Sequence, residues 1–279
     1  MTHTHPTDRW RQCLQGRTGV FSHPHDLRFA YCLYVPPPAP GQPPPGLVVT
    51  VHHSLRNFME CRDLFSDFGQ RHRCVVLAPL FPINVRGDGE ADGYKYLREG
   101  DIRYDRLLNE MVHVVAQHTG CQAQRFFLQG YSGGGHFVQR YFLLHPQRLR
   151  APAIGAPGQV TLLDDQAPWW GGVADLPALF GQPLDRAALR HVPVQMVVGE
   201  LNTRTDEIGP APAHPCWPDE ASRHAAHRGD RLRQLQRSYQ QAGIDVSFEL
   251  MPGVPHGAGT VPAIERACRF FQRHLAGTD

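Results

Sequence analysis

The sequence lacks a strong net charge, a long apolar run and any basic stripe interleaved with aromatic residues. Its formal net charge is +2 with histidine neutral, so no field is expected that would attract nucleic acid or an anionic membrane. A helix needs about 20 apolar residues to cross a bilayer, and no apolar stretch of the sequence approaches that length. Residues 1–6 contain no apolar segment of the kind found in secretory signal peptides. We therefore expect a soluble, cytoplasmic protein with neither nucleic acid nor a membrane as partner.

The sequence also lacks closely paired cysteines. Its seven cysteines form no CxxC motif, their number is odd, and several lie in apolar runs, so they are expected to be reduced core residues. The early histidines at positions 3, 5, 23 and 25 match the spacing of no common metal site. We accordingly expect no metal and no other cofactor.

What is present is an alternation of strand-like and helix-like segments. Apolar, β-branched runs typical of buried parallel strands alternate with helical patterns, and 41% hydrophobic residues are ample for a core. The expected strands cover 18–22, 26–35, 47–53, 74–80, the run before Gly130, 151–155, 192–199 and 246–250. The alternation predicts an α/β fold with a mostly parallel, doubly wound sheet and helices on both faces. With no internal repeat and no clear linker, residues 1–279 are expected to form a single domain.

The alternation pauses over residues 159–190, which we interpret as an inserted lid. This segment contains the adjacent pair Trp169 and Trp170. Two neighbouring tryptophans are rarely exposed without purpose, so they either bind a substrate or pack as the lid's own small core. We take them as candidate substrate-binding residues, and with Phe81 and Tyr94 opposite they would suit a hydrophobic or aromatic group.

The most informative stretch is Gly130-Tyr131-Ser132-Gly133-Gly134, which follows an apolar strand-like run and opens a helical pattern. A serine on such a sharp turn has its hydroxyl pushed out of the backbone, and small neighbours are needed because larger side chains would collide. The N–H groups at the start of the following helix favour negative charge on the serine's reaction partner. Ser132 is therefore the candidate nucleophile.

A serine hydroxyl needs a base to take its proton. His256 lies between Pro255 and Gly257, in a kinked loop after the last predicted strand, where the carboxyl ends of parallel strands meet. His136 is nearer in sequence, but a helical side chain there would point back along its own helix. His256 is therefore the candidate base.

The order Ser132, acid, His256, together with the sharp Gly130–Gly134 turn (the elbow) and the Pro252–Gly257 loop, resembles the α/β-hydrolase superfamily from about residue 18 to residue 275. The most similar groups are bacterial esterases, polyhydroxyalkanoate-depolymerase-like enzymes and dienelactone-hydrolase-like enzymes. The resemblance implies a serine hydrolase fold that needs no cofactor, but it does not identify the substrate.

The acid departs from the superfamily pattern, because Asn202 stands where an aspartate is usual, three residues after Gly199. Asparagine can hold the tautomer of the imidazole but cannot stabilise an imidazolium by charge. Several carboxylates are alternatives, with Glu207 preferred as the third catalytic residue: Glu207, Asp206, Glu200, Asp164 and Asp165.

An oxyanion hole needs two N–H donors. The resemblance places one at Gly133, directly after the nucleophile, and the other in the His52-His53-Ser54 loop, at Ser54 or next at Leu55.

These observations predict a serine hydrolase that cleaves an ester-like bond of a hydrophobic or aromatic small molecule through an acyl-enzyme intermediate. Two alternatives stay open on the same fold: a non-catalytic ligand-binding protein, which Asn202 favours, and an acyltransferase or thioesterase. The expected partner is a small-molecule substrate, and the chain is a monomer or a homo-oligomer.

Overall fold

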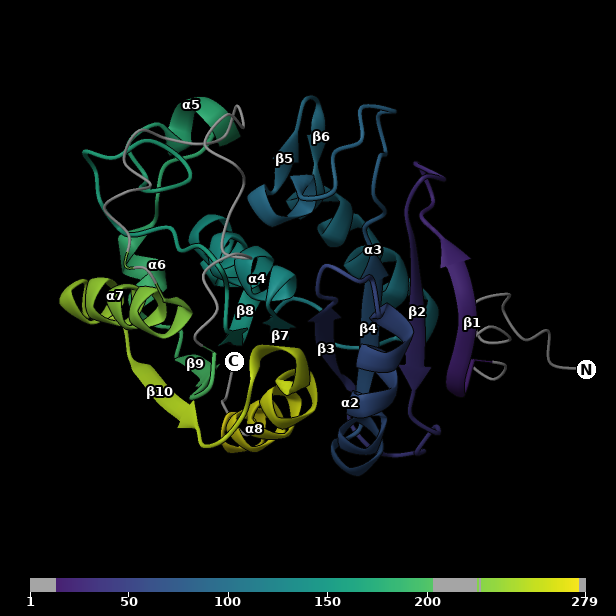
Figure 1. The fold of residues 1–279 in the computed structure, drawn as a ribbon. Coiled ribbons are helices and arrows are strands. Elements are labelled where there is room, and N and C mark those ends of the chain that lie inside the picture. The colour runs from purple at the N-terminus through teal and green to yellow at the C-terminus, as the bar shows by residue number, and fades with distance from the viewer. Residues whose placement is uncertain (1–13, 203–224, 226, 276–279) are drawn as a thin grey trace, which may run out of the picture.

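The computed structural model describes residues 14–202, 225 and 227–275 of the chain (Figure 1). Its main sheet has eight strands in the order β1-β2-β4-β3-β7-β8-β9-β10. Strand β1 pairs antiparallel with β2, β2 pairs antiparallel with β4, and the pairs from β4 through β10 are parallel. The strands are β1 (Gly16–Ser22), β2 (Ala30–Val35), β3 (Gly46–Val51), β4 (Cys74–Leu80), β7 (Phe126–Tyr131), β8 (Leu149–Gly155), β9 (Val194–Gly199) and β10 (Val246–Met251).

Helices cover both faces of this sheet, so the predicted mostly parallel, doubly wound α/β fold is confirmed. The helices are α2 (Phe58–His72), α3 (Tyr104–Thr119), α4 (Gly133–Leu144), α5 (Leu176–Phe180), α6 (Arg186–Arg190), α7 (Arg228–Gln241) and α8 (Thr260–Arg273). Short 3-10 turns form at η1 (Gly93–Tyr96), η2 (Pro146–Arg148) and η4 (His256–Ala258), and a small hairpin joins β5 (Arg98–Glu99) to β6 (Ile102–Arg103).

The two-residue side-chain period of the strands divides the core into two layers. Val48, Val76 and Phe127 point to the face covered by α2 and α8, where they pack with Phe65 and Phe271. Their neighbours along the same strands point to the other face, where α3, α4 and α7 pack. Figure 1 shows α2 and α8 side by side on the first face. Burial on both faces explains why these strands read as continuous apolar runs.

The second strand differs from its prediction. It begins at Ala30, not at residue 26, because residues 23–29 form a turn. His23 Nδ1 accepts the backbone N–H groups of His25 (3.3 Å) and Asp26 (3.1 Å), and the His23 N–H donates to Phe29 O (2.9 Å). The polar side-chain bonds offer the backbone an alternative to the sheet ladder.

The segment 159–190, predicted as a lid, lies between β8 and β9 and contains α5 and α6 (Figure 1). Its role as a lid and the parse of residues 1–279 as one domain stay predictions. Over the described part of the chain, the structure contains no helix with both the length and the apolar character that crossing a membrane requires.

Candidate active site

The turn from β7 into α4 forces Ser132 into an unusual backbone conformation. Its φ and ψ are 55° and −113°, outside the regions that L-residues prefer, and its N–H donates to Gly155 O (2.8 Å). The flanking glycines are required by close approach: a β-carbon on Gly130 would lie 2.3 Å from the carbonyl carbon of Gly134. A β-carbon on Gly134 would lie 2.2 Å from Val51 O. The strain is of the kind that structures retain at functional sites.

This packing predicts that Gly134→Ala destabilises the protein. Alanine is favoured over glycine in a helix by up to about 1 kcal/mol, but overpacking against a backbone oxygen costs about 1–3 kcal/mol or more. We expect a net loss of about 2 kcal/mol in the free energy of unfolding, measured by urea denaturation. Gly257→Ala is the matched control, because a β-carbon there meets nothing within 4 Å. Equal urea midpoints for the two variants would contradict the predicted contact.

His256 lies at the start of η4, in the loop that follows β10, and its ring reaches the elbow. The Ser132 Oγ to His256 Nε2 distance is 2.9 Å across 124 residues of chain. The ring of Tyr131 stacks on the imidazole with centroids 5.3 Å apart, and its hydroxyl donates to His256 O (3.1 Å). The structure thus brings together the two side chains proposed from sequence as nucleophile and base, at hydrogen-bond distance.

Asn202 occupies the position behind His256. Its side-chain amide nitrogen lies 3.0 Å from His256 Nδ1, while its Oδ1 is buried with no hydrogen-bond partner among the described residues. Rotating the amide by 180° pairs Oδ1 with the Nδ1–H of His256 and moves the amide nitrogen to the buried position, where no partner is described. That arrangement holds the tautomer in which Nε2 is free to accept the Ser132 proton.

The described carboxylates that were candidates for the third catalytic residue interact with other groups. Glu200 accepts the Gly253 N–H (2.9 Å) and so braces the loop that carries His256. Asp165 pairs with Arg186 (2.8 Å), and Asp164 accepts the Gln166 N–H (2.8 Å) in a local turn. Glu207 and Asp206 lie outside the described residues, so the role given to Glu207 stays a prediction. Among the described residues, the groups at His256 Nδ1 are the neutral Asn202 amide (3.0 Å) and the neutral Tyr131 hydroxyl (3.4 Å).

The pKa of His256 is lowered to about 4, first by burial, then by the positive charge of Arg228, then by His53. No carboxylate is among the causes. The imidazole therefore stays neutral, and able to act as a base, in mildly acidic solution where an ordinary histidine is protonated.

The lowered pKa of His256 determines the expected pH profile of hydrolysis. For a neutral ester, kcat/KM is expected to fall only as the pH approaches about 4, because protonation of the free imidazole removes the base. Asn202→Asp places a negative charge beside Nδ1 and is expected to raise the midpoint of this acid limb by about 1–3 pH units. Asn202→Ala is the control: it removes the amide without adding charge, so it lowers kcat without raising the midpoint. An Asn202→Asp profile superimposable on the native one would contradict the assignment.

Two backbone amides face the space beside Ser132. A β-carbon on Gly133 would lie 3.2 Å from Ser54 N, so the two N–H groups are neighbours. The Ser54 N–H has no acceptor among the described residues, and the Gly133 N–H, first in α4, has none within its helix. The same β-carbon would lie 2.0 Å from the Tyr94 hydroxyl, which is buried without a hydrogen-bond partner among the described groups. These three polar groups therefore lie close together around residue 133, and the oxyanion-hole role given to the Gly133 and Ser54 amides stays a prediction.

Two buried histidines hold these loops in place. His52 Nδ1 contacts His53 O (2.8 Å) and its Nε2 accepts the Phe81 N–H (3.0 Å), while burial lowers its pKa to about 3. His136 donates from Nδ1 to Ser132 O (2.9 Å), one turn back along its helix as predicted, and accepts the Gln159 N–H (2.9 Å). Both rings are neutral, and their hydrogen bonds stabilise the Ser54 loop and the elbow, respectively. A histidine within an apolar run was their signal in the sequence.

A cavity of about 450 Å³ opens beside Ser132 and His256. Two cationic side chains line it, Lys95 from η1 and Arg228 from the start of α7. Sequence reasoning missed both, because neither falls in a motif. Lys95 is the single lysine of the chain, which was the one available signal.

Trp169 and Trp170 do not line this cavity. Trp170 is 1% exposed and packs on Tyr96 with ring centroids 6.2 Å apart, and Trp169 packs on Phe180 at 4.9 Å. The guanidinium of Arg140 lies over both indoles, at 5.8 Å from Trp169 and 5.6 Å from Trp170. The pair therefore packs partly within its own segment, on Phe180, and partly against η1 and α4, through Tyr96 and Arg140, and it does not line the cavity as a substrate-binding pair would.

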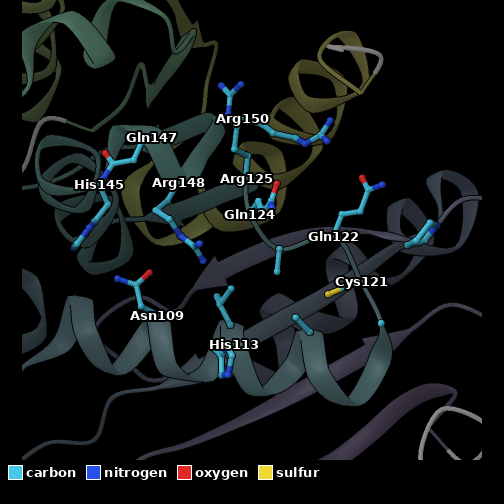
Figure 2. Close-up of a pocket in the computed structure, with 15 residues that line it drawn as sticks. Asn109, His113, Cys121, Gln122, Gln124, Arg125, His145, Gln147, Arg148 and Arg150 are labelled. Atoms are coloured by element: carbon cyan, nitrogen blue, oxygen red, sulfur yellow. The ribbon is translucent and has the colours of Figure 1, made fainter. Parts of the chain in front are cut away.

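A larger hollow of about 790 Å³ lies elsewhere (Figure 2). Asn109 and His113 line it from α3, and Arg125, Arg148 and Arg150 line it from the starts of β7 and β8. It therefore lies at the amino ends of the strands. Catalytic loops of parallel sheets lie at the carboxyl ends, which is where Ser132, Asn202 and His256 are found.

No protein-family model matches the sequence, and no curated protein matches it. Solved structures do match. A poly(3-hydroxybutyrate) depolymerase, LpqC, from Bordetella parapertussis aligns with a TM-score of 0.70 at 22% identity, covering 95% of this chain and 92% of its own. Poly(aspartic acid) hydrolase-1 from Sphingomonas sp. KT-1 aligns with a TM-score of 0.68 at 18% identity, covering 91% and 98%. An S-formylglutathione hydrolase from Agrobacterium tumefaciens aligns with a TM-score of 0.57 at 18% identity, covering 92% and 94%.

The chain has the α/β-hydrolase fold, which confirms the resemblance stated from the elbow and the His256 loop. At these identities the likeness establishes the fold, and the chemistry has to be argued from this chain's own residues.

Proposed function

We propose that this chain is a serine hydrolase that cleaves an ester-like bond through an acyl-enzyme intermediate. The observation that carries the proposal is the Ser132 Oγ to His256 Nε2 distance of 2.9 Å at a strained elbow. The named activities of the similar structures, a depolymerase and two hydrolases, agree with bond hydrolysis.

In the first step His256 Nε2 takes the Ser132 proton as Oγ attacks the ester carbonyl. The amides of Gly133 and Ser54 donate to the developing oxyanion, each such donor typically contributing about 3 kcal/mol to the transition state. The imidazolium then gives its proton to the leaving oxygen. In the second step water, deprotonated by the same imidazole, releases the acyl group and restores Ser132.

Asn202 shapes the energetics of this cycle. Its amide oxygen orients the ring but cannot stabilise the imidazolium by charge, and Arg228 disfavours that cation further. The free enzyme therefore has a weak base by the standard of a triad with a carboxylate. This same feature favours the second candidate, a ligand-binding protein on the hydrolase fold.

The expected hydrophobic or aromatic group of the substrate rested on Trp169 and Trp170, with Phe81 and Tyr94 opposite. Because none of these four lines the cavity beside Ser132, we propose an ester-like bond and no longer propose that group.

A fluorophosphonate probe tests the proposal. We expect one label per chain, on the peptide containing Ser132, because only an activated serine attacks phosphorus at a useful rate. The same preparation is assayed with 4-nitrophenyl esters of increasing acyl length. Folded protein that neither labels nor hydrolyses any ester, yet binds a ligand saturably, would make the chain a binding protein.

A further inference from the structure

The hydroxyl of Tyr94 is buried and has no hydrogen-bond partner among the described residues. The side chain belongs to η1 and is 1% exposed. Most buried hydroxyls are paired, because an unpaired one loses the hydrogen bonds that water would make with it. The Ser54 side chain is near enough to affect the pKa of Tyr94, but the two hydroxyls do not form a hydrogen bond. The resting fold therefore does not explain this hydroxyl.

The hydroxyl lies against the residue that follows the nucleophile. A β-carbon on Gly133 would lie 2.0 Å from the Tyr94 oxygen and 3.2 Å from Ser54 N, so residue 133 can carry no β-carbon while Tyr94 holds this position. Gly133 and Tyr94 both lie behind the described lining of the cavity beside Ser132. The hydroxyl is therefore a close neighbour of the two amides predicted to bind an oxyanion.

Ring contacts fix the hydroxyl in this position. The Tyr94 ring packs on His52 with centroids 5.0 Å apart and on Phe81 at 5.9 Å. Arg56 Cζ lies 5.2 Å from the centroid of the same ring, and the Arg56 guanidinium also donates to Ser54 O (2.5 Å). A donor that is already held in place stabilises a transition state effectively, because it does not have to reorganise during the reaction.

The protonation state suits a donor. Burial raises the pKa of Tyr94, so the hydroxyl keeps its proton at neutral pH. Lys95 also approaches residue 133, since its Cε would lie 3.2 Å from the same β-carbon, but its ammonium pairs with Asp92 (2.6 Å). The side-chain donor that remains beside Gly133 is therefore the tyrosine hydroxyl.

We propose that the Tyr94 hydroxyl is a third oxyanion donor, which acts together with the Gly133 and Ser54 amides. The assignment deepens the proposed function and rests on it for the reaction. As Ser132 Oγ bonds to the carbonyl carbon, the electron pair of the C=O π bond moves to oxygen, and the Tyr94 O–H donates to that oxyanion without transferring its proton. The hydrogen bond is released when the carbonyl forms again. The partner of this hydroxyl thus exists only during the reaction.

A third donor matters more in this chain because of Asn202. Attack by Ser132 creates an oxyanion and an imidazolium in the same step. The neutral Asn202 amide cannot stabilise the imidazolium by charge. Stronger stabilisation of the oxyanion lowers the same barrier from its other side, so the Tyr94 hydroxyl would offset part of what a carboxylate usually supplies.

Tyr94→Phe tests the proposal, because it removes the hydroxyl and keeps the ring. We expect kcat for 4-nitrophenyl acetate to fall about 100-fold, the scale of losing one oxyanion donor. KM should not change, since the interaction is made only in the transition state. The urea midpoint should not fall, because the hydroxyl has no hydrogen bond to lose among the described residues of the resting protein.

Tyr239→Phe is the matched control. Tyr239 is a second fully buried tyrosine whose hydroxyl has no partner among the described residues, but it lies on α7 and packs on Phe142 with ring centroids 5.6 Å apart. It is expected to keep the native kcat. A structural role for the Tyr94 hydroxyl gives the opposite pattern, in which Tyr94→Phe lowers the urea midpoint and keeps the native kcat. That pattern would overturn the assignment.

A transition-state analogue provides a second readout. A trifluoromethyl ketone with a pentyl chain forms a hemiketal oxyanion on an activated serine, and its dissociation constant can be measured by ¹⁹F NMR. We expect Tyr94→Phe to raise this constant about 100-fold, in proportion to the loss of kcat/KM. Equal constants for native protein and Tyr94→Phe would refute the third donor and leave the proposed function standing. Native protein that neither hydrolyses an ester nor forms the adduct would refute the proposed function, and the third donor with it.

Discussion

Replacing Ser132 with alanine is expected to lower kcat for ester hydrolysis by about 10⁶-fold, the scale of the loss when the nucleophilic serine of a serine protease is removed. The reason is geometric. Ser132 Oγ is the one hydroxyl within reach of His256 Nε2 among the described residues, at 2.9 Å, and the strained backbone of residue 132 aims it there. Alanine has no oxygen to form the acyl-enzyme, so only binding and the oxyanion donors remain.

The measurement is initial-rate kinetics with a 4-nitrophenyl ester, alongside fluorophosphonate labelling. Ser247→Ala is the matched control, because Ser247 is an exposed serine on β10 whose hydroxyl contacts Val194 O (3.4 Å). It should label and turn over like native protein. If Ser132→Ala kept a tenth of native activity while folded, the nucleophile would have to be another residue.

The second large effect is expected at His256. His256→Ala removes the base, and in a comparable hydrolase loss of the histidine costs about as much as loss of the serine, about 10⁶-fold in kcat. Fluorophosphonate labelling of Ser132 should slow in parallel, because both reactions need the hydroxyl proton removed. Added imidazole is expected to restore part of the rate, since the truncated ring leaves space open to the cavity that His256 lines.

His113→Ala provides the control for that experiment. His113 is exposed on α3 and lines the hollow of Figure 2, away from Ser132. Native rates for His113→Ala and a low, imidazole-dependent rate for His256→Ala are expected. The reverse order would place the chemistry at the amino ends of the strands and end the proposal.

Local sequence patterns predicted the sheet and the elbow well, because their causes are local. A strand buried on both faces must be apolar throughout, and a turn in which a β-carbon would meet a backbone atom at 2.2–2.3 Å must be glycine. His256 was predicted from topology alone, since the loop after the last parallel strand ends at the same edge as the elbow.

The third catalytic residue was harder to predict from the sequence. Six residues in two loops were candidates, and the order of residues in a loop does not tell which side chain turns inward. Asn202 is 4% exposed and faces His256, whereas Glu200 turns to the Gly253 N–H. The tryptophan pair shows the same limit: adjacent tryptophans predicted either substrate binding or packing, and only the positions of Tyr96, Phe180 and Arg140 decide that the pair packs against η1, its own segment and α4.

By itself, then, the sequence determined the layered sheet, the strained serine and the loop that carries the imidazole, because each leaves a short-range signature of polarity or glycine. Only the tertiary structure decided that a neutral amide backs the imidazole and that Lys95 and Arg228 line the cavity. Those residues lie more than 130 positions apart along the chain and meet only when loops from different strands converge. The sequence near each residue therefore does not predict that their two positive charges lie beside Ser132.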